Sequence, residues 1–226
     1  MTRQHAKWVA PAVAALVLML PVAASAWSGT LLSMDGGILG TGAWVDPGPS
    51  SLSWEVTQNP DMTWHYRYLF SHPAGATSHF IIEVSPTFTL NDFLGGGGDY
   101  GELEFGWHQV MAGNPNMPEA IFGLKFNEAT GTETEVWFDS FRAPMWGDFY
   151  AKNGRVPGTD IFNTAWNAGF AMGDSDPMLP PHDGPEQYHL LVPDTHDTPP
   201  VPEPSTLLLL GPGLIGLAAF MRRKRQ

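Results

Sequence analysis

The fold class of this chain is decided by the stretch WHYRYLF at residues 64–70. Aromatic residues occupy every second position of the stretch, and His65, Arg67 and Leu69 stand between them. Successive side chains of a β-strand point to opposite faces of the sheet. The stretch therefore predicts a strand with one face in an aromatic core and the other face turned outward.

The same alternation recurs along the chain, with turn residues in between. It predicts further strands at residues 53–57, 80–85, 121–126, 135–141, 146–151 and 187–192. The pair Asn153-Gly154 favours a tight hairpin, and the glycine run at residues 95–98 favours a flexible loop. No stretch has convincing helical periodicity. We therefore expect an all-β fold, an antiparallel β-sandwich or jelly-roll-like single domain over residues 27–193.

The C-terminal end of the chain has three parts in sequence. The triplet Pro202, Glu203, Pro204 ends an acidic, proline-rich linker at residues 194–204. The uncharged, apolar run at residues 205–221 is just long enough to cross a bilayer as a helix. The basic tail at residues 222–226 would stay on the cytoplasmic side, which leaves the rest of the chain on the other side. The stop-transfer cations of this tail are Arg222, Arg223, Lys224 and Arg225.

This order of parts resembles the PEP-CTERM sorting signal. The resemblance implies that Pro202, Glu203 and Pro204 are recognised by an exosortase-like processing protease. It also implies a precursor held in the inner membrane by its C-terminal helix and then delivered to the cell envelope, the surface or an exopolysaccharide matrix. An ordinary tail anchor behind a proline-rich linker is the alternative. Residues 121–127 and 136–154 resemble a pattern in the bodies of other PEP-CTERM proteins, which implies a shared β domain and no known activity.

Residues 1–26 have the form of a secretory signal peptide. Two basic residues precede an apolar run at residues 9–22, and Ala24 and Ala26 fit the rule of small residues at a cleavage site. Cleavage after Ala26 would make Trp27 the first mature residue. An N-terminal membrane anchor is the alternative, and it is disfavoured by the short apolar run. Export across the inner membrane is the expected route.

The charge of the mature body excludes some partners. Six of the 11 Lys and Arg residues lie in the two ends, so five remain in residues 27–204 against all 23 Asp and Glu residues, a formal charge of −18. Such a surface repels phosphate backbones, which argues against nucleic acid as a partner. The chain has no Cys, so the exported body must be held together by packing without disulfides. Nine Trp and 13 Phe indicate a bulky aromatic core.

The sequence offers no strong metal or cofactor site. Two sets of histidines are spaced by seven residues but match no metal motif: His65, His72 and His79, and His182, His189 and His196. Calcium is the one ion left open, because acidic loops supply the oxygen ligands it prefers. Its candidate ligands, which solvated turn carboxylates would equally explain, are Asp99, Glu102, Glu104, Asp174, Asp176, Asp194 and Asp197. We expect no bound cofactor and no metal.

Catalysis is not indicated either. The pairs Glu102 with Glu104 and Glu133 with Glu135 share strand faces, but alternating acids on a solvated face are common. We expect no catalytic residue, so the leading hypothesis is an exported structural or interaction protein without enzymatic activity. The alternative is an extracellular carbohydrate-binding module, with calcium as an optional aid. Core packing competes with sugar stacking as the role of Trp107, Trp137, Trp146 and Trp166.

Overall fold

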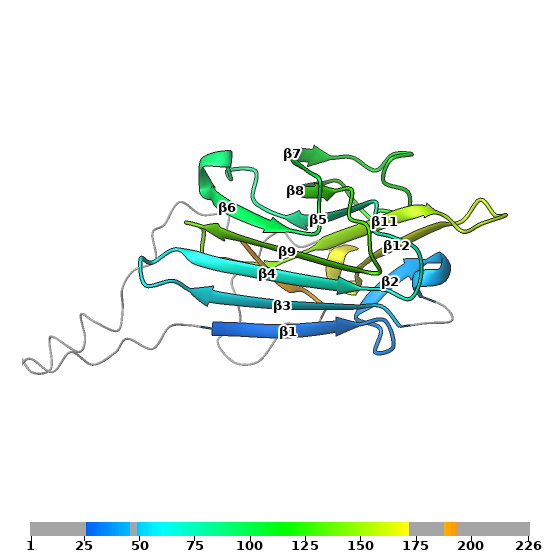
Figure 1. The fold of residues 1–226 in the computed structure, drawn as a ribbon, viewed down its shortest axis with the longest axis horizontal. Helices are drawn as coiled ribbons and strands as arrows, with labels where there is room; N and C mark the ends of the chain where they lie inside the picture. Colours follow the sequence, from blue (N-terminus) through cyan, green and yellow to red (C-terminus); the bar gives the residue numbers. More distant parts are fainter. Residues whose placement is uncertain (1–25, 46–48, 172–187, 194–226) are drawn as a thin grey trace, which may run out of the picture.

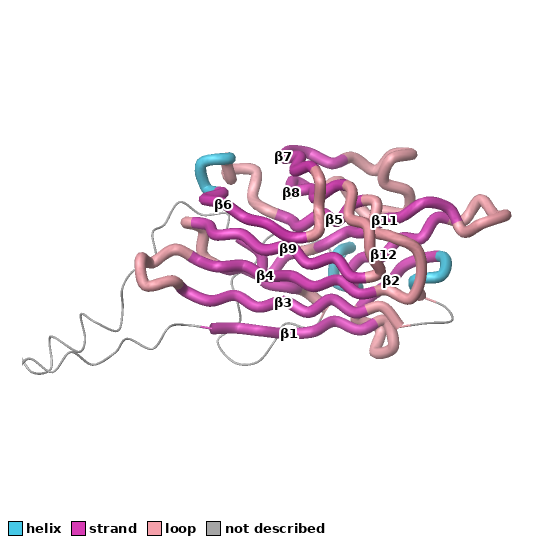
Figure 2. Tube along the Cα trace, in the orientation of Figure 1, coloured by secondary structure: helices cyan, strands magenta, loops and turns pink. Residues whose placement is uncertain are grey.

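The computed structural model describes residues 26–45, 49–171 and 188–193. These residues form β-strands and three short 3-10 turns, so the prediction of an all-β, antiparallel fold is confirmed (Figure 2). In the described ranges no helix has both the length and the apolar character needed to cross a membrane. The predicted signal peptide up to residue 25, the linker, the apolar run and the basic tail lie outside these ranges.

One antiparallel sheet contains the strand predicted from residues 64–70. Figure 1 shows β1, β3, β4 and β9 running alongside one another in it, with β6 at the far edge. Across the sheet the order is β1 (Ala26–Leu32), β3 (Ser51–Gln58), β4 (Trp64–Ser71), β9 (Glu133–Ser140) and β6 (Phe93–Gly98). We call it the five-stranded sheet.

A second antiparallel sheet has six strands. Its order is β2 (Ile38–Thr41), β12 (Phe162–Asn167), β11 (Phe149–Arg155), β5 (His79–Glu83), β8 (Ile121–Asn127) and β7 (Glu102–His108). A small third sheet pairs β10 (Pro144–Gly147) with β13 (Leu190–Pro193). The 3-10 turns are η1 (Gly42–Trp44), η2 (Leu90–Asp92) and η3 (Ala168–Ala171).

The two large sheets pack face to face through aromatic rings. All four alternate aromatic residues of β4 are buried, with at most 4% of each side chain exposed. The Phe70 ring centroid lies 6.0 Å from that of Phe80 and 5.9 Å from that of Phe149, both in the six-stranded sheet. Phe138 of β9 and Phe126 of β8 make a similar contact at 6.2 Å. The core is therefore a single aromatic layer shared by both sheets, as in a sandwich.

The two buried tyrosines of β4 also satisfy their hydroxyl groups. Tyr66 donates its hydroxyl hydrogen to the carbonyl of Arg142 at 2.7 Å, and Tyr68 donates to the carbonyl of Leu191 at 2.8 Å. Burial raises the pKa of Tyr68 well above its usual value, so the hydroxyl stays a donor. The second bond ties β13 to the centre of the five-stranded sheet.

Three local predictions were wrong. Asn153-Gly154 makes no hairpin, because β11 continues through it with a register shift between Lys152 and Arg155. The reversal follows at residues 156–161, where the Val156 amide donates to the Ile161 carbonyl at 2.7 Å. The glycine run at residues 95–98 is part of strand β6 and pairs with β9. The strand expected at residues 146–151 is divided between two sheets, as β10 and β11.

A buried histidine closes a hydrogen-bond chain at the end of β4. Thr134 donates to the Thr77 hydroxyl at 2.7 Å, and that hydroxyl lies 2.9 Å from His72 Nε2. His72 Nδ1 lies 3.1 Å from the Ala74 carbonyl, and its ring stacks on Trp44. In this arrangement Nδ1 donates and Nε2 accepts, so the ring is neutral. Burial accordingly lowers the pKa of His72 from 6.5 to about 4.

This histidine makes stability depend on pH. The unfolded chain binds a proton on His72 as the pH falls through 6.5, whereas the folded chain resists until about pH 4. We therefore expect the free energy of unfolding to decrease as the pH is lowered from 6.5 to about 4. His72 contributes up to about 1.4 kcal/mol of this loss per pH unit. Denaturant titrations of wild type and His72→Gln across this pH range measure how much of the pH dependence of the free energy of unfolding comes from His72. An unchanged slope in the variant would contradict the assignment.

Candidate functional site

In the part of the chain that the structure describes, no element packs on the outer face of the five-stranded sheet, whereas the other sheet is partly covered. On the six-stranded sheet a second apolar cluster, which includes Met117 and Phe170, packs over Ile81 and Tyr150. The Tyr150 hydroxyl donates to the carbonyl of Pro115 at 2.6 Å, which ties the covering loop to β11. The side chains that alternate with the core aromatics of the five-stranded sheet remain partly or fully exposed. They form the candidate binding face.

One residue from each strand lines up across this face. Strand register pairs Ser28 with Glu55, Glu55 with Arg67, Arg67 with Trp137, and Trp137 with Gly97. We call these five residues the cross-strand row. Neighbouring strands lie roughly 4.8 Å apart, so the four spacings of the row span roughly 19 Å. Residues between 28 and 137 are thus brought into one line by the pairing of five strands.

Trp137 is the aromatic member of the row, and 38% of its surface is exposed. Its ring lies against Gly97 of edge strand β6, where an added Cβ would stand 2.9 Å from the indole. A side chain at Gly97 would displace the indole. The glycine run therefore leaves room for the tryptophan and keeps its ring accessible.

An ion pair and a His–Asp hydrogen bond flank Trp137. Glu135 Oε1 accepts from Arg67 Nε at 2.8 Å, and His65 Nδ1 lies 2.8 Å from Asp139 Oδ1. Glu135 and Asp139 stand two residues before and after Trp137 on β9, so both share its face. The Arg67 guanidinium holds the pKa of Glu135 below its usual range, and Glu135 raises the pKa of Arg67. Both carboxylates are therefore oriented acceptors beside an exposed ring.

A hollow of about 260 Å³ lies at the β1 end of the row. It is bordered by Ser28, Gly29, Thr30, Ser53, Trp54, Glu55, Arg67 and Leu69. Gly29 faces the core side of β1, where a Cβ would collide with the buried Trp54 ring at 2.4 Å. On the outer face, hydroxyl groups, a carboxylate and a guanidinium surround the small recess.

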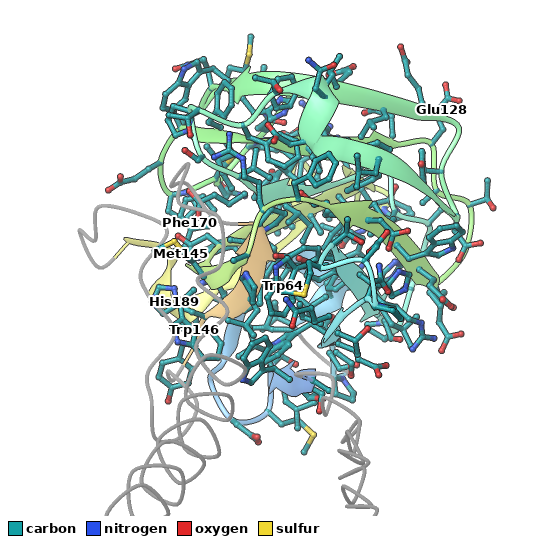
Figure 3. All side chains as sticks on the ribbon, turned by 90° about the vertical axis from the view of Figure 1, so that its left-hand side faces the viewer. Trp64, Glu128, Met145, Trp146, Phe170 and His189 are labelled. Atoms are coloured by element: carbon teal, nitrogen blue, oxygen red, sulfur yellow. The ribbon has the colours of Figure 1, made fainter. Side chains whose placement is uncertain are left out.

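The four tryptophans proposed for sugar stacking do not share one platform. Trp146 is buried and packs edge-on against Trp54, so a stacking role for it was wrong. Trp146 pairs with Leu191, two residues after His189, and Figure 3 labels Trp146 and His189. Trp166 packs on the apolar cluster of the six-stranded sheet. Trp107 is 57% exposed on edge strand β7, where its ring meets Phe122 edge-on.

The histidines are dispersed over the fold. His65 lies on the open face, His72 in the core, and His79 and His189 are buried in other strands or beside them. His182 and His196 lie outside the described residues. Among the residues that the structure describes, no group of three or more His, Asp or Glu side chains is placed to hold a metal ion.

The described acidic candidates have other partners. Asp99 accepts a hydrogen bond from the Glu135 amide at 3.0 Å, and Glu104 forms an ion pair with Lys125 at 2.9 Å. Glu102 and Glu133 are exposed at the starts of β7 and β9. The remaining calcium candidates, Asp174, Asp176, Asp194 and Asp197, lie outside the described residues.

The predicted signal-cleavage site adjoins the first strand. Ala26 is the first residue of β1 and pairs with Thr57, and Trp27 stacks on Trp64 at 5.3 Å. Ala24 lies outside the described residues, as do Pro202, Glu203 and Pro204 of the triplet. The same holds for the basic residues Arg222, Arg223, Lys224 and Arg225.

Sequence reasoning found Trp137 but missed its companions. The alternation places His65 and Arg67 on the outer face, yet their distances from Trp137 follow from the pairing of β4 with β9. The residues near β4 do not predict that pairing, because Glu135 lies 68 residues after Arg67 and Asp139 lies 74 residues after His65. The site is therefore a product of strand register.

The glycine edge gives a direct test of this geometry. Gly98 has a φ of +132°, and an added Cβ would lie 2.1 Å from the Glu135 carbonyl oxygen. We expect Gly98→Ala to lower the free energy of unfolding by about 2 kcal/mol or more. Thermal melting should show a drop of roughly 5 °C. Gly154→Ala is the matched control, since nothing lies within 4 Å of its added Cβ. Equal melting temperatures for both variants would contradict this account of β6.

Comparison with known proteins adds one match. The family model for the PEP-CTERM protein-sorting motif matches residues 200–225. No curated protein and no solved structure matches the chain. The sorting-signal prediction is thereby confirmed for the C-terminal residues. The chain carries a PEP-CTERM sorting motif, which implies export, membrane-associated processing by an exosortase and localisation at the cell surface.

Proposed function

We propose that this protein is a non-catalytic interaction protein of the cell surface or of an exopolysaccharide matrix. The observation that carries the proposal is the sorting motif at residues 200–225, which follows soon after the last strand of the β domain at Pro193. In this proposal the motif is removed or processed and the β domain is the delivered part. The Arg67–Glu135 ion pair and the His65–Asp139 hydrogen bond on its open face support a binding role.

The ends of the chain have separate roles in this proposal. Signal peptidase cuts after Ala26, which leaves β1 as the start of the mature chain. The apolar residues 205–221 hold the precursor in the inner membrane, and the basic residues 222–225 keep the tail in the cytoplasm. The exosortase-like protease recognises Pro202, Glu203 and Pro204. These residues are substrate features of the precursor.

Mass spectrometry of both termini in the native host tests the route. We expect the mature protein to begin at Trp27 and to lack the basic tail. Replacing Pro202, Glu203 and Pro204 together by Ala should leave the tail attached and the protein in the membrane fraction. Pro199→Ala is the matched control and should be processed normally. Recovery of the native protein from the cytosol with both ends intact would overturn the proposal.

Carbohydrate binding is the second candidate function. The observation in its favour is the exposed Trp137 ring between Arg67–Glu135 and His65–Asp139. A flat aromatic face packs on the C–H face of a sugar ring, and flanking polar groups accept or donate hydrogen bonds to its hydroxyls. Such a module would hold the delivered protein in a polysaccharide matrix.

A pull-down on purified host exopolysaccharide tests this candidate. We expect Trp137→Ala to lose about tenfold in retention, because the variant removes the stacking ring. Trp107→Ala removes a more exposed ring on the other sheet and should bind normally. The assay is run with and without calcium, and calcium-dependent retention would support an ion-assisted mode. Equal retention of both variants would count against the Trp137 face.

A further inference from the structure

We propose that the cross-strand row binds a linear polysaccharide that carries free, positively charged amino groups. This inference rests on the carbohydrate-binding function proposed above and names the ligand chemistry of the same face. The row, the Arg67–Glu135 ion pair, the His65–Asp139 hydrogen bond and the hollow at the β1 end form one continuous surface on the five-stranded sheet.

The Trp137 ring favours a cation as well as a sugar ring. An ammonium group within about 6 Å of a tryptophan ring centroid is attracted by the electron density of the ring face. Trp137 presents a partly exposed ring on β9, the strand next to edge strand β6. An amino sugar stacked on this ring gains both the apolar contact and the cation–π attraction.

The charges around the ring favour the same ligand. Carboxylates of Glu55, Glu133, Glu135 and Asp139 share this outer face, and Arg67 is its guanidinium cation. Arg67 is already paired with Glu135 and lies within electrostatic reach of Glu55. The face therefore carries a net negative charge. It attracts polymer amines and repels uronic acids and phosphates.

The shape of the surface favours a chain over a single sugar. The row crosses all five strands, a span of roughly 19 Å at the usual strand spacing. Trp137 lies near the β6 end, whereas the hollow of about 260 Å³ lies at the β1 end beside Glu55. A ligand that uses both features must extend along the row, so one sugar unit sits at the ring and another at the hollow.

Binding of defined oligosaccharides to the full-length chain in detergent micelles tests the inference. The probes are a glucosamine oligomer, its N-acetylated counterpart of equal length, and an oligogalacturonate, compared at mildly acidic pH where the amines are charged. We expect the glucosamine oligomer to bind about tenfold more tightly than the acetylated one. Added salt should remove most of that difference, because it screens exposed charges.

Matched variants locate the contribution of each group. Trp137→Ala should lower the affinity for the glucosamine oligomer about tenfold. Glu55→Gln, a substitution of equal size, should lower it by about threefold and weaken its salt dependence. Trp107→Ala should leave binding unchanged. Unchanged thermal melting of each variant shows that the fold is intact.

The remaining outcomes separate the two levels of the proposal. Equal, salt-independent binding of the acetylated oligomer, still lost in Trp137→Ala, would overturn the charge inference and leave carbohydrate binding standing. Preference for the oligogalacturonate would also overturn the inference. If none of the three oligosaccharides binds, this inference is wrong and the host exopolysaccharide pull-down alone decides whether the face binds carbohydrate.

Discussion

Aromatic stacking between β4 and the opposite sheet is the interaction on which the rest of the domain depends. With no cysteine in the chain, no disulfide links the sheets, so Phe70, Phe80, Phe149 and their neighbours supply the cohesion. Rings of this size bury a large apolar area each and also gain from their mutual geometry. The hydroxyls of Tyr66 and Tyr68 are the polar groups that this packing must accommodate. Both donate to backbone carbonyls from outside the sheet, and these bonds hold the segment between β9 and β10 and strand β13 against it.

Because each strand of this sheet turns one face to the core, the side chains of its other face are available to contact a ligand. On β4 and β9 the outward residues include three carboxylates, a guanidinium, an imidazole and an indole. They are held by a rigid backbone rather than by loops, so their spacing is set by strand pairing. Edge strand β6 has glycines in place of larger residues, and the absence of a side chain at Gly97 leaves space for the Trp137 ring. A sheet with larger side chains at this edge would cover the Trp137 ring.

The sequence predicts the strands whose alternation is strong and fails where the signal is weak. The strands at residues 64–70 and 121–126 alternate bulky apolar residues with polar or small ones, and both appear as expected. Strand β6 was predicted as a loop because glycine has no side chain to alternate. Asn153-Gly154 was assigned to a hairpin because local preferences do not reveal a register shift within β11. Sequence reasoning also left out β1, β2, β7 and β12, of which β1, β2 and β7 lie at sheet edges.

The sequence predicts which residues of the candidate site point outward, but it does not predict that strand pairing brings them together. The outward positions of His65, Arg67 and Trp137 follow from period-two alternation alone. Their meeting depends on β4 pairing with β9 in one register, and a slip by one residue would turn Trp137 inward. Burial likewise separates Trp146 from Trp137, although both are tryptophans in aromatic stretches. Physical context therefore decides which aromatic residue can meet a ligand.

The bond from Tyr68 to Leu191 joins residues 123 positions apart. A core closed by such distant segments has a high contact order, and chains of this kind fold slowly because large loops must close first. The central strand cannot reach its final environment until the last strand of the domain has been synthesised. The packing around Tyr68 is therefore completed only after nearly the whole domain has been made.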